Sequence, residues 1–156
     1  NSAGINTSEV YWVKNNGYGA YELRTYTHKF LKLYRRVIYT PNKRIANRKL
    51  LNKLDLQTLS LWYMDDGGLS RRKLMDGSYS IHELMLNTHV SREDNQVIID
   101  YFKEVWDIQF TQVKNKGRYR LRCGKQVALK FLELVSPTIQ TNVPCMMYKV
   151  DVNLIR

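Results

Sequence analysis

An internal repeat constrains the fold of this chain more than any single motif does. Three segments return in the same order and at similar spacing: VKNNG at 13–17 as VKNKG at 113–117, YELR at 21–24 as YRLR at 119–122, and FLKL at 30–33 as FLEL at 131–134. Each copy then reaches a lysine near its end, Lys43 in the first and Lys149 in the second. Because ordered matches of this kind rarely arise by chance, we predict two related units that share a core.

Each copy is predicted to contain a hairpin followed by a helix. Asn-Asn-Gly and Asn-Lys-Gly suit tight hairpin turns, because Asn and Gly tolerate positive φ. In the second copy Tyr119, Leu121 and Cys123 fall on one face of the expected strand. The opposite face carries a row of arginines, Arg118, Arg120 and Arg122. Such a row either protects an exposed sheet edge from aggregation or forms a surface that contacts the phosphates and bases of a nucleic acid. The positive net charge of the chain favours the nucleic-acid contact.

The second copy is predicted to be complete. Strands are expected at 69–73 and 78–88 across a Met-Asp-Gly turn, then a helix at 91–106 that Ser91 caps. The helix that follows each hairpin is expected near 29–37 in the first copy and near 125–135 in the second. With a helix at 59–68 the order becomes αββαββα, an α+β fold. We therefore predict a partial first pseudo-repeat at 1–55 and a complete second one at 56–156.

Composition limits the classes of partner. The net charge is +11 with a pI near 9.7, and residues 1–55 hold 11 basic against 3 acidic side chains. Such a balance favours a polyanion, most often nucleic acid. The apolar runs are too short to span a membrane. The two cysteines, Cys123 and Cys145, fit no metal spacing and are predicted to be small core residues. Because cysteines are few and we recognise no signal peptide, we expect an intracellular, reducing compartment.

The stretch LSLWYMDDGG at 59–68 combines an apolar helix with two adjacent carboxylates. A helix that is apolar on all sides needs burial on all sides, and its natural partner is the equivalent helix of the other repeat. Gly67 and Gly68 are expected to turn the chain tightly, which leaves Asp65 and Asp66 at the base of the helix pair beside the basic sheet. Carboxylates there repel phosphate unless a divalent cation offsets their charge, and Mg²⁺ is the usual one.

Together with LNT at 86–88 and CMMYK at 145–149, this stretch resembles the LAGLIDADG homing endonucleases, in the double-motif, single-chain, intron-encoded subgroup. The resemblance covers nearly the whole chain. It implies a saddle-shaped antiparallel sheet that lies in the major groove of double-stranded DNA, and Mg²⁺-dependent (or Mn²⁺-dependent) hydrolysis of a phosphodiester bond. It further implies that Asp66 binds the metal, with Gly67 beside it and Asp65 in a supporting role at most.

The resemblance also implies one basic residue per half near the scissile phosphates, Lys149 in the second half and Lys43 in the first. Lys43 is equally well explained as one solvated charge among many. The predicted contacts to DNA are basic residues of the hairpins and the first strand: Arg24, Arg71, Arg72, Lys114, Lys116, Arg118, Arg120 and Arg122. The histidines His28, His82 and His89 form no ligand pattern and are expected to be polar surface or DNA-contact residues.

The sequence departs from the subgroup in one respect, because a first motif helix does not precede the first copy. We expect a fragment, a second chain or N-terminal segment that supplies the other helix, or the loss of one catalytic half. Two other function classes stay open. One is a nucleic-acid-binding module on the same fold, such as an intron maturase that binds RNA, and the other is a structural protein of a ribonucleoprotein.

Overall fold

The computed structural model describes residues 6–15, 17–26, 28–40 and 43–153. The chain divides by internal contacts into two compact units, Asn1–Thr40 and Pro41–Arg156. This division falls before the predicted start of the second pseudo-repeat at 56, because helix α2 (Arg48–Leu51) packs against helix α4 (Arg92–Trp106) of the larger unit. The division into pseudo-repeats stays a prediction.

The smaller unit contains the predicted hairpin and helix. Its elements are β1 (Tyr11–Asn15), β2 (Tyr18–Glu22), α1 (Lys29–Ile38) and β3 (Tyr39–Thr40). Strands β1 and β2 pair antiparallel, and Gly17 in the turn has φ of 87°. Trp12 lies opposite Tyr21, and their rings meet edge to face with centroids 5.0 Å apart. The hairpin and helix expected here are confirmed.

The larger unit has the predicted αββαββα order. After β4 (Lys43–Arg44) and α2 it runs through α3 (Leu56–Asp66), β5 (Gly67–Lys73), β6 (Tyr79–Asn87), α4, β7 (Thr111–Asn115), β8 (Arg118–Gly124) and α5 (Lys125–Asn142), and reaches the 3₁₀ helix η1 (Pro144–Lys149). The four strands form an antiparallel sheet in the order β5-β6-β8-β7. The predicted α+β fold class is confirmed.

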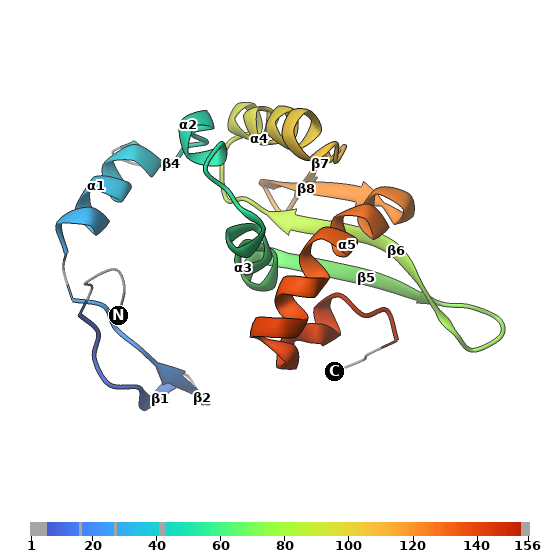
Figure 1. The fold of residues 1–156 in the computed structure, drawn as a ribbon, viewed down its shortest axis with the longest axis horizontal. Helices are drawn as coiled ribbons and strands as arrows, with labels where there is room; N and C mark the ends of the chain where they lie inside the picture. Colours follow the sequence, from blue (N-terminus) through green and yellow to red (C-terminus); the bar gives the residue numbers. More distant parts are fainter. Residues whose placement is uncertain (1–5, 16, 27, 41–42, 154–156) are drawn as a thin grey trace. The chain divides into compact units, whose positions relative to one another are not determined.

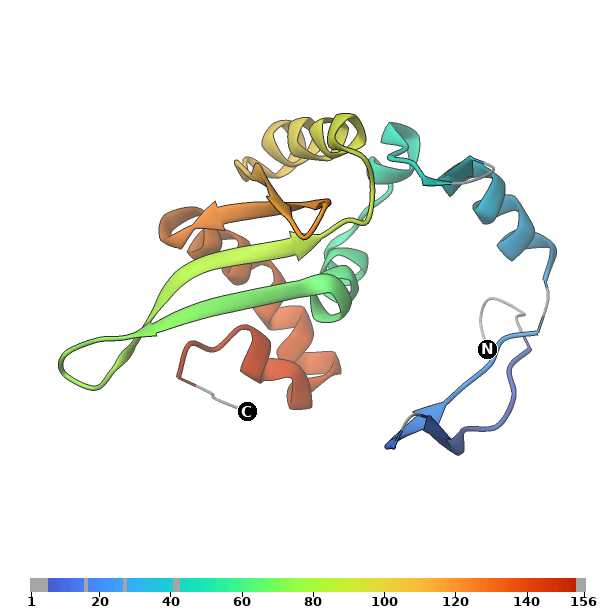
Figure 2. The same ribbon diagram turned by 180° about the vertical axis from the view of Figure 1, so that it is seen from behind.

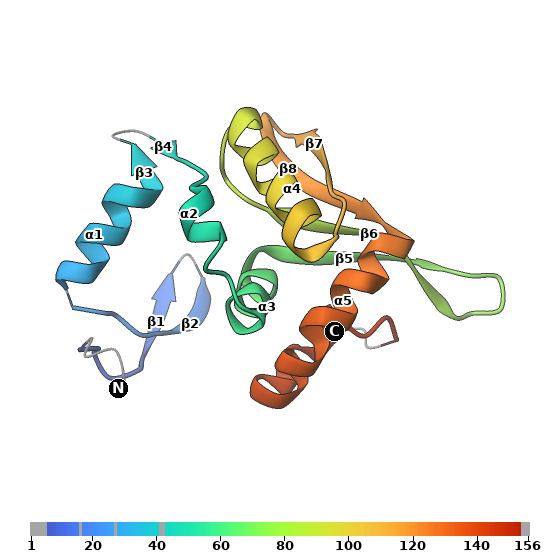
Figure 3. The same cartoon turned by 45° about the horizontal axis from the view of Figure 1, so that its top comes forward.

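Helices α4 and α5 cover one face of the sheet. Figures 1 and 3 show α4 and α5 on the same side of the strands, and α5 also packs against α3. Figure 2, drawn from behind, shows the strands in front of α5. The core between the layers is apolar and rich in edge-to-face aromatic pairs; it includes Tyr63, Phe102, Phe110, Phe131, Leu84, Leu86, Leu121 and Ile139. We call the face opposite the helices the open face.

Alternation along the strands separates core residues from open-face residues. Leu84 and Leu86 on β6 pair with Cys123 and Leu121 on β8, and all four are buried. Their neighbours point the other way, as the sequence pattern predicts.

A bulge shifts the register between β5 and β6. Ser70 pairs with Glu83 whereas Arg71 pairs with Ile81, so His82 is the extra residue on β6. The bulge explains why the buried residues Ile81 and Leu84 are three positions apart in a strand whose period is two.

Local caps explain where the helices begin. Ser91 accepts a hydrogen bond from the Asp94 amide at the start of α4, as predicted, and Asp55 caps α3 by accepting from the Thr58 amide. Helix α5 was expected to end near residue 135, before Ser136 and Pro137, but it continues to Asn142. Burial of Ile139 against the core favours the longer helix over the local preference for a break. Among the residues that the structure describes, no helix is long and apolar enough to cross a bilayer.

Candidate active site and nucleic-acid interface

Helix α3 passes directly into strand β5 without the tight turn that we expected. The helix ends at Asp66, and Gly67 already has extended backbone angles, φ −85° and ψ 156°. Gly67 is needed for close approach and not for a turn, because a Cβ there would lie 2.1 Å from Cδ2 of the Tyr63 ring. At Gly68 an added Cβ would meet nothing within 4 Å.

One side of α3 is buried and another is exposed. Leu59, Ser60 and Tyr63 are buried against the core. Leu61 on the other side is 53% exposed and Leu56 is 42% exposed. Within the described residues α3 is therefore buried on one side, and burial of its other side against an equivalent helix stays a prediction.

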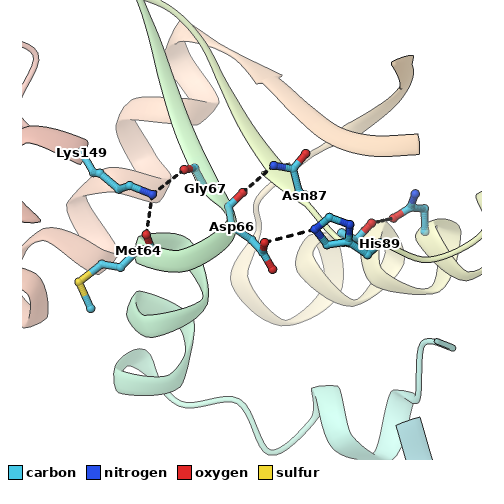
Figure 4. Close-up of polar contacts among 8 residues, drawn as sticks. Met64, Asp66, Gly67, Asn87, His89 and Lys149 are labelled. Atoms are coloured by element: carbon cyan, nitrogen blue, oxygen red, sulfur yellow. Dashed lines mark hydrogen bonds and ion pairs between the residues drawn. The ribbon is translucent and has the colours of Figure 1, made fainter. Parts of the chain in front are cut away.

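Lys149 lies at the C-terminal end of α3, where we predicted the reacting phosphate. Its ammonium donates to the carbonyl oxygen of Met64 and, at 3.0 Å, to that of Gly67 (Figure 4). A cation there is favoured because the helix dipole places partial negative charge on the last helix carbonyls, that of Met64 among them.

The buried Tyr63 on α3 forms a second link to η1, at the backbone of Lys149 itself. Its hydroxyl donates to the Lys149 carbonyl oxygen at 2.8 Å. Burial raises the pKa of Tyr63 above its ordinary value, so the phenol keeps the proton that it donates.

Asp66 is held by the segment that follows β6. Its carboxylate oxygen Oδ1 lies 3.3 Å from Nε2 of His89, and its backbone carbonyl accepts from the side-chain NH₂ group of Asn87 at 3.1 Å (Figure 4). His89 has φ of 56°, and the preceding Thr88 is buried with its hydroxyl 2.6 Å from the Asn95 side-chain oxygen. The Asp66 side chain keeps 25% of its surface exposed.

Sequence reasoning missed Asn87 and His89 as neighbours of Asp66. The available signal was the hairpin register: counting back from the turn at 75–77 places the end of β6 beside the start of β5. His28 lies in the smaller unit and His82 at the bulge. Asp65, given a supporting role, is exposed.

The donor set near Asp66 is small. The described part of the chain contains no group of three or more His, Cys, Asp or Glu side chains placed to hold a metal ion. The Gly67 carbonyl, predicted to bind metal beside Asp66, accepts a hydrogen bond from the Lys149 ammonium, and a positive charge therefore occupies the position next to this oxygen. Asp66 fits a metal that takes its remaining ligands from water and phosphate.

Two predicted DNA contacts on the sheet are placed differently from the expectation. Arg71 lies on the helix-covered face, where its guanidinium donates to the backbone carbonyls of Tyr148 and Asp151. Placing Arg71 on the DNA surface was therefore wrong; it ties η1 to β5. Lys114 pairs with Tyr119 and shares its side of the ladder, so it is exposed but not on the open face.

The other predicted contacts differ in how their charge is engaged. Arg122 is on the open face as predicted, but its guanidinium pairs with Glu83. Arg72, Lys116 and Arg118 are exposed, and Arg120 is partly buried. Arg24 in the smaller unit pairs with Glu22 and lies over the Tyr11 ring. Lys43 belongs to β4, and its side chain lies outside the described part of the structure.

The two cysteines differ from each other. Cys123 is buried as predicted, and burial raises its pKa to about 12. Cys145 is exposed in η1, so its predicted core position was wrong.

Comparison with known proteins identifies the family. The sequence model of the LAGLIDADG DNA endonuclease family matches residues 3–131. The chain belongs to this family. Its resemblance to the LAGLIDADG enzymes, inferred above from the motif, is confirmed.

Two relatives of this LAGLIDADG chain are informative. The intron-encoded endonuclease ai4 of Dictyostelium discoideum is 24% identical over 135 residues, which cover 85% of this chain and 77% of that protein. The solved structure of the homing endonuclease I-WcaI bound to its DNA recognition sequence has a TM-score of 0.72 at 21% identity and covers 96% of this chain. This chain spans 66% of the length of that structure, and the likeness shows that the two share a fold.

Proposed function

We propose that this chain is a site-specific DNA endonuclease, or a large part of one, that hydrolyses a phosphodiester bond beside Asp66. The observation that carries the proposal is the arrangement where the motif helix enters the sheet: His89 contacts the Asp66 carboxylate, and Lys149 contacts the carbonyl of the next residue, Gly67. Family membership and the excess of basic residues support the same reaction on a polyanion. The relatives named above are described as an intron-encoded endonuclease and a homing endonuclease bound to DNA.

Mg²⁺ or Mn²⁺ is the cofactor that Asp66 would hold, because a partly exposed carboxylate is a hard oxygen ligand of the kind these ions prefer. When bound, the ion would supply positive charge that stabilises the charge developing on the phosphate. Lys149 would add a second positive charge at the same helix end. His89 and Asn87 would keep the Asp66 carboxylate in one orientation, which matters because a small misplacement of a reacting group slows a reaction strongly.

Double-stranded DNA would bind on the open face. Side chains there can enter a B-DNA major groove, whereas the major groove of A-form RNA is too narrow for them. If about 8 to 10 phosphates are neutralised, affinity should fall by roughly three to five orders of magnitude between 50 and 200 mM salt. A flat salt response would rule out binding of this kind.

The test of the reaction is Asp66→Asn, with Asp65→Asn as its matched neighbour. A supercoiled plasmid that carries a duplex selected by the wild-type protein is incubated with Mg²⁺ and each protein. We expect Asp66→Asn to lose cleavage while DNA binding is kept or slightly tightened, because one negative charge facing phosphate is removed. Asp65→Asn should retain most activity.

The plasmid products also test the number of strands cut. One motif carboxylate predicts a nicked circle, and a linear product would require a second motif helix from an adjoining segment or another chain. Equal cleavage by wild type and Asp66→Asn would refute the assignment. Tight binding without cleavage in the presence of any divalent metal would favour the alternative function, a nucleic-acid-binding module such as an RNA-splicing maturase.

A further inference from the structure

A pocket of about 410 Å³ lies between the end of β6 and the β7–β8 turn. Its volume is within the range of sites that hold small ligands or parts of larger ones. We call it the turn pocket, and its lining is polar and basic: Asn87, His89, Asn115, Lys116, Arg118, Tyr119 and Arg120.

The charges of the turn pocket are uncompensated. Lys116, Arg118 and Arg120 carry three positive charges, and no carboxylate is among the described residues that line the pocket. None of the three forms an ion pair within the described part of the chain, whereas Arg122 on the same strand is neutralised by Glu83. The Nε atom of Arg120 is also buried without a hydrogen-bond partner. The hydrogen-bonding capacity of the Arg120 guanidinium is therefore not filled by the residues that the structure describes.

The turn that carries two of these cations has a fixed geometry. Lys116 and Gly117 both have positive φ, 46° and 80°, as a two-residue hairpin turn with matching twist requires. Arg118 follows directly at the start of β8 and pairs with Asn115. The backbone from which Lys116 and Arg118 project is therefore defined before a ligand arrives, which reduces the backbone entropy lost on binding.

The turn pocket adjoins the candidate active site through one residue. His89 lines the pocket and also lies 3.3 Å from the Asp66 carboxylate. A group bound in the pocket would thus sit next to the carboxylate but not on the Lys149 side of it.

We propose that the turn pocket binds a non-scissile phosphodiester of the DNA strand that reacts at Asp66, an inference that rests on the proposed function. A base edge carries no net charge, whereas a phosphodiester supplies one negative charge together with acceptor oxygens that several of these cations can share. Arg118 and Arg120 then position the strand and do not read its sequence. The arginine row was expected to contact phosphates and base edges, and this proposal assigns Arg120 to a phosphate.

The first experiment measures binding of mixed-sequence and selected duplexes by Lys116→Ala and Arg118→Ala over a range of salt concentrations. For each variant we expect about a tenfold loss of affinity, equal on both duplexes, and a salt slope reduced by about one. Lys103→Ala, which removes the same charge from an exposed position on α4, should leave both values nearly unchanged. An unchanged slope in the pocket variants, or a loss confined to the selected duplex, would overturn the proposal.

The second experiment locates the phosphate. Single methylphosphonates, which neutralise one phosphate each, are placed along the selected duplex. At one position near the cleavage site we expect the loss of affinity to match that of Arg118→Ala, with no further loss when the two changes are combined. Losses that add at every position would refute the proposal, provided that the variant unfolds at the wild-type temperature. Both readouts are binding, so they remain decisive even if Asp66→Asn shows that the reaction is wrongly assigned.

Discussion

The two adjacent glycines at the start of β5 should respond very differently to substitution by alanine. In Gly67→Ala the new methyl group would lie 2.1 Å from Cδ2 and 2.4 Å from the backbone oxygen of Tyr63. Neither atom can move away easily. The ring is fully buried, packs edge to face on Phe131 with centroids 5.3 Å apart, and is tied by its hydroxyl to η1. The Tyr63 oxygen accepts the last backbone hydrogen bond of α3 from Gly67 itself.

These constraints set the size of the effect. Overpacking a core typically costs about 1–3 kcal/mol, and a clash with backbone belongs at the upper end, so we expect about 3 kcal/mol lost in the free energy of unfolding. For a unit of this size the melting temperature should fall by roughly 10 °C. Gly68→Ala should change stability by less than about 0.5 kcal/mol, because the site is open and its φ is not positive.

The assay is urea unfolding followed by circular dichroism, with DNA cleavage measured in parallel. Gly67→Ala should also reduce cleavage at temperatures where the protein stays folded, because the shift displaces Asp66 and the carbonyl that Lys149 contacts. Equal stability of the two alanine variants would refute this account of the junction. A Gly68→Ala variant that is the less stable of the two would refute it as well.

Two further predictions concern buried groups. Thr88→Val should cost about 1–3 kcal/mol in the free energy of unfolding, because it leaves the Asn95 side-chain oxygen buried without a donor. Thr88→Ser keeps the hydroxyl and should be close to wild type. Equal melting temperatures of the two variants would contradict this prediction. In the native protein near pH 8, Cys145 should react with a thiol reagent because it is exposed, whereas Cys123 should react only on unfolding. Burial raises the Cys123 pKa to about 12, so at pH 8 the folded protein holds little of its reactive thiolate. Two thiols titrated at once in folded protein would contradict this.

The sequence was sufficient for the order of elements in the larger unit. Turn residues, alternating strands and the Ser91 cap are local signals, and each predicted its element. The junction after Asp66 was less accessible, because glycine pairs suit both turns and close packing, and the choice depends on the position of the Tyr63 ring. The end of α5 was missed for a similar reason, since burial of Ile139 is a tertiary effect.

The candidate site was predictable in part. The motif pointed to Asp66 and Lys149, but their contacts depend on how η1 packs against the end of α3. The contact of His89 with Asp66 follows from strand register, which the bulge alters by one residue. Arg71 was misplaced because adjacent basic residues look equivalent in sequence, whereas neighbours on a strand face opposite sides of the sheet.

The bulge at His82 has a consequence for the length of sequence that such a protein could recognise. Because His82 is the extra residue, removing it would leave Ile81 and Glu83 on the faces they already occupy, so the core of β6 would tolerate the deletion. What would change is the extra twist that a bulge adds, and with it the direction of the hairpin beyond Ser70. If DNA follows the open face, this hairpin contacts the outermost base pairs of the target. Under the proposed function, gain or loss of one residue at the bulge would then alter where recognition ends along the duplex, while the residues around Asp66 stay in place.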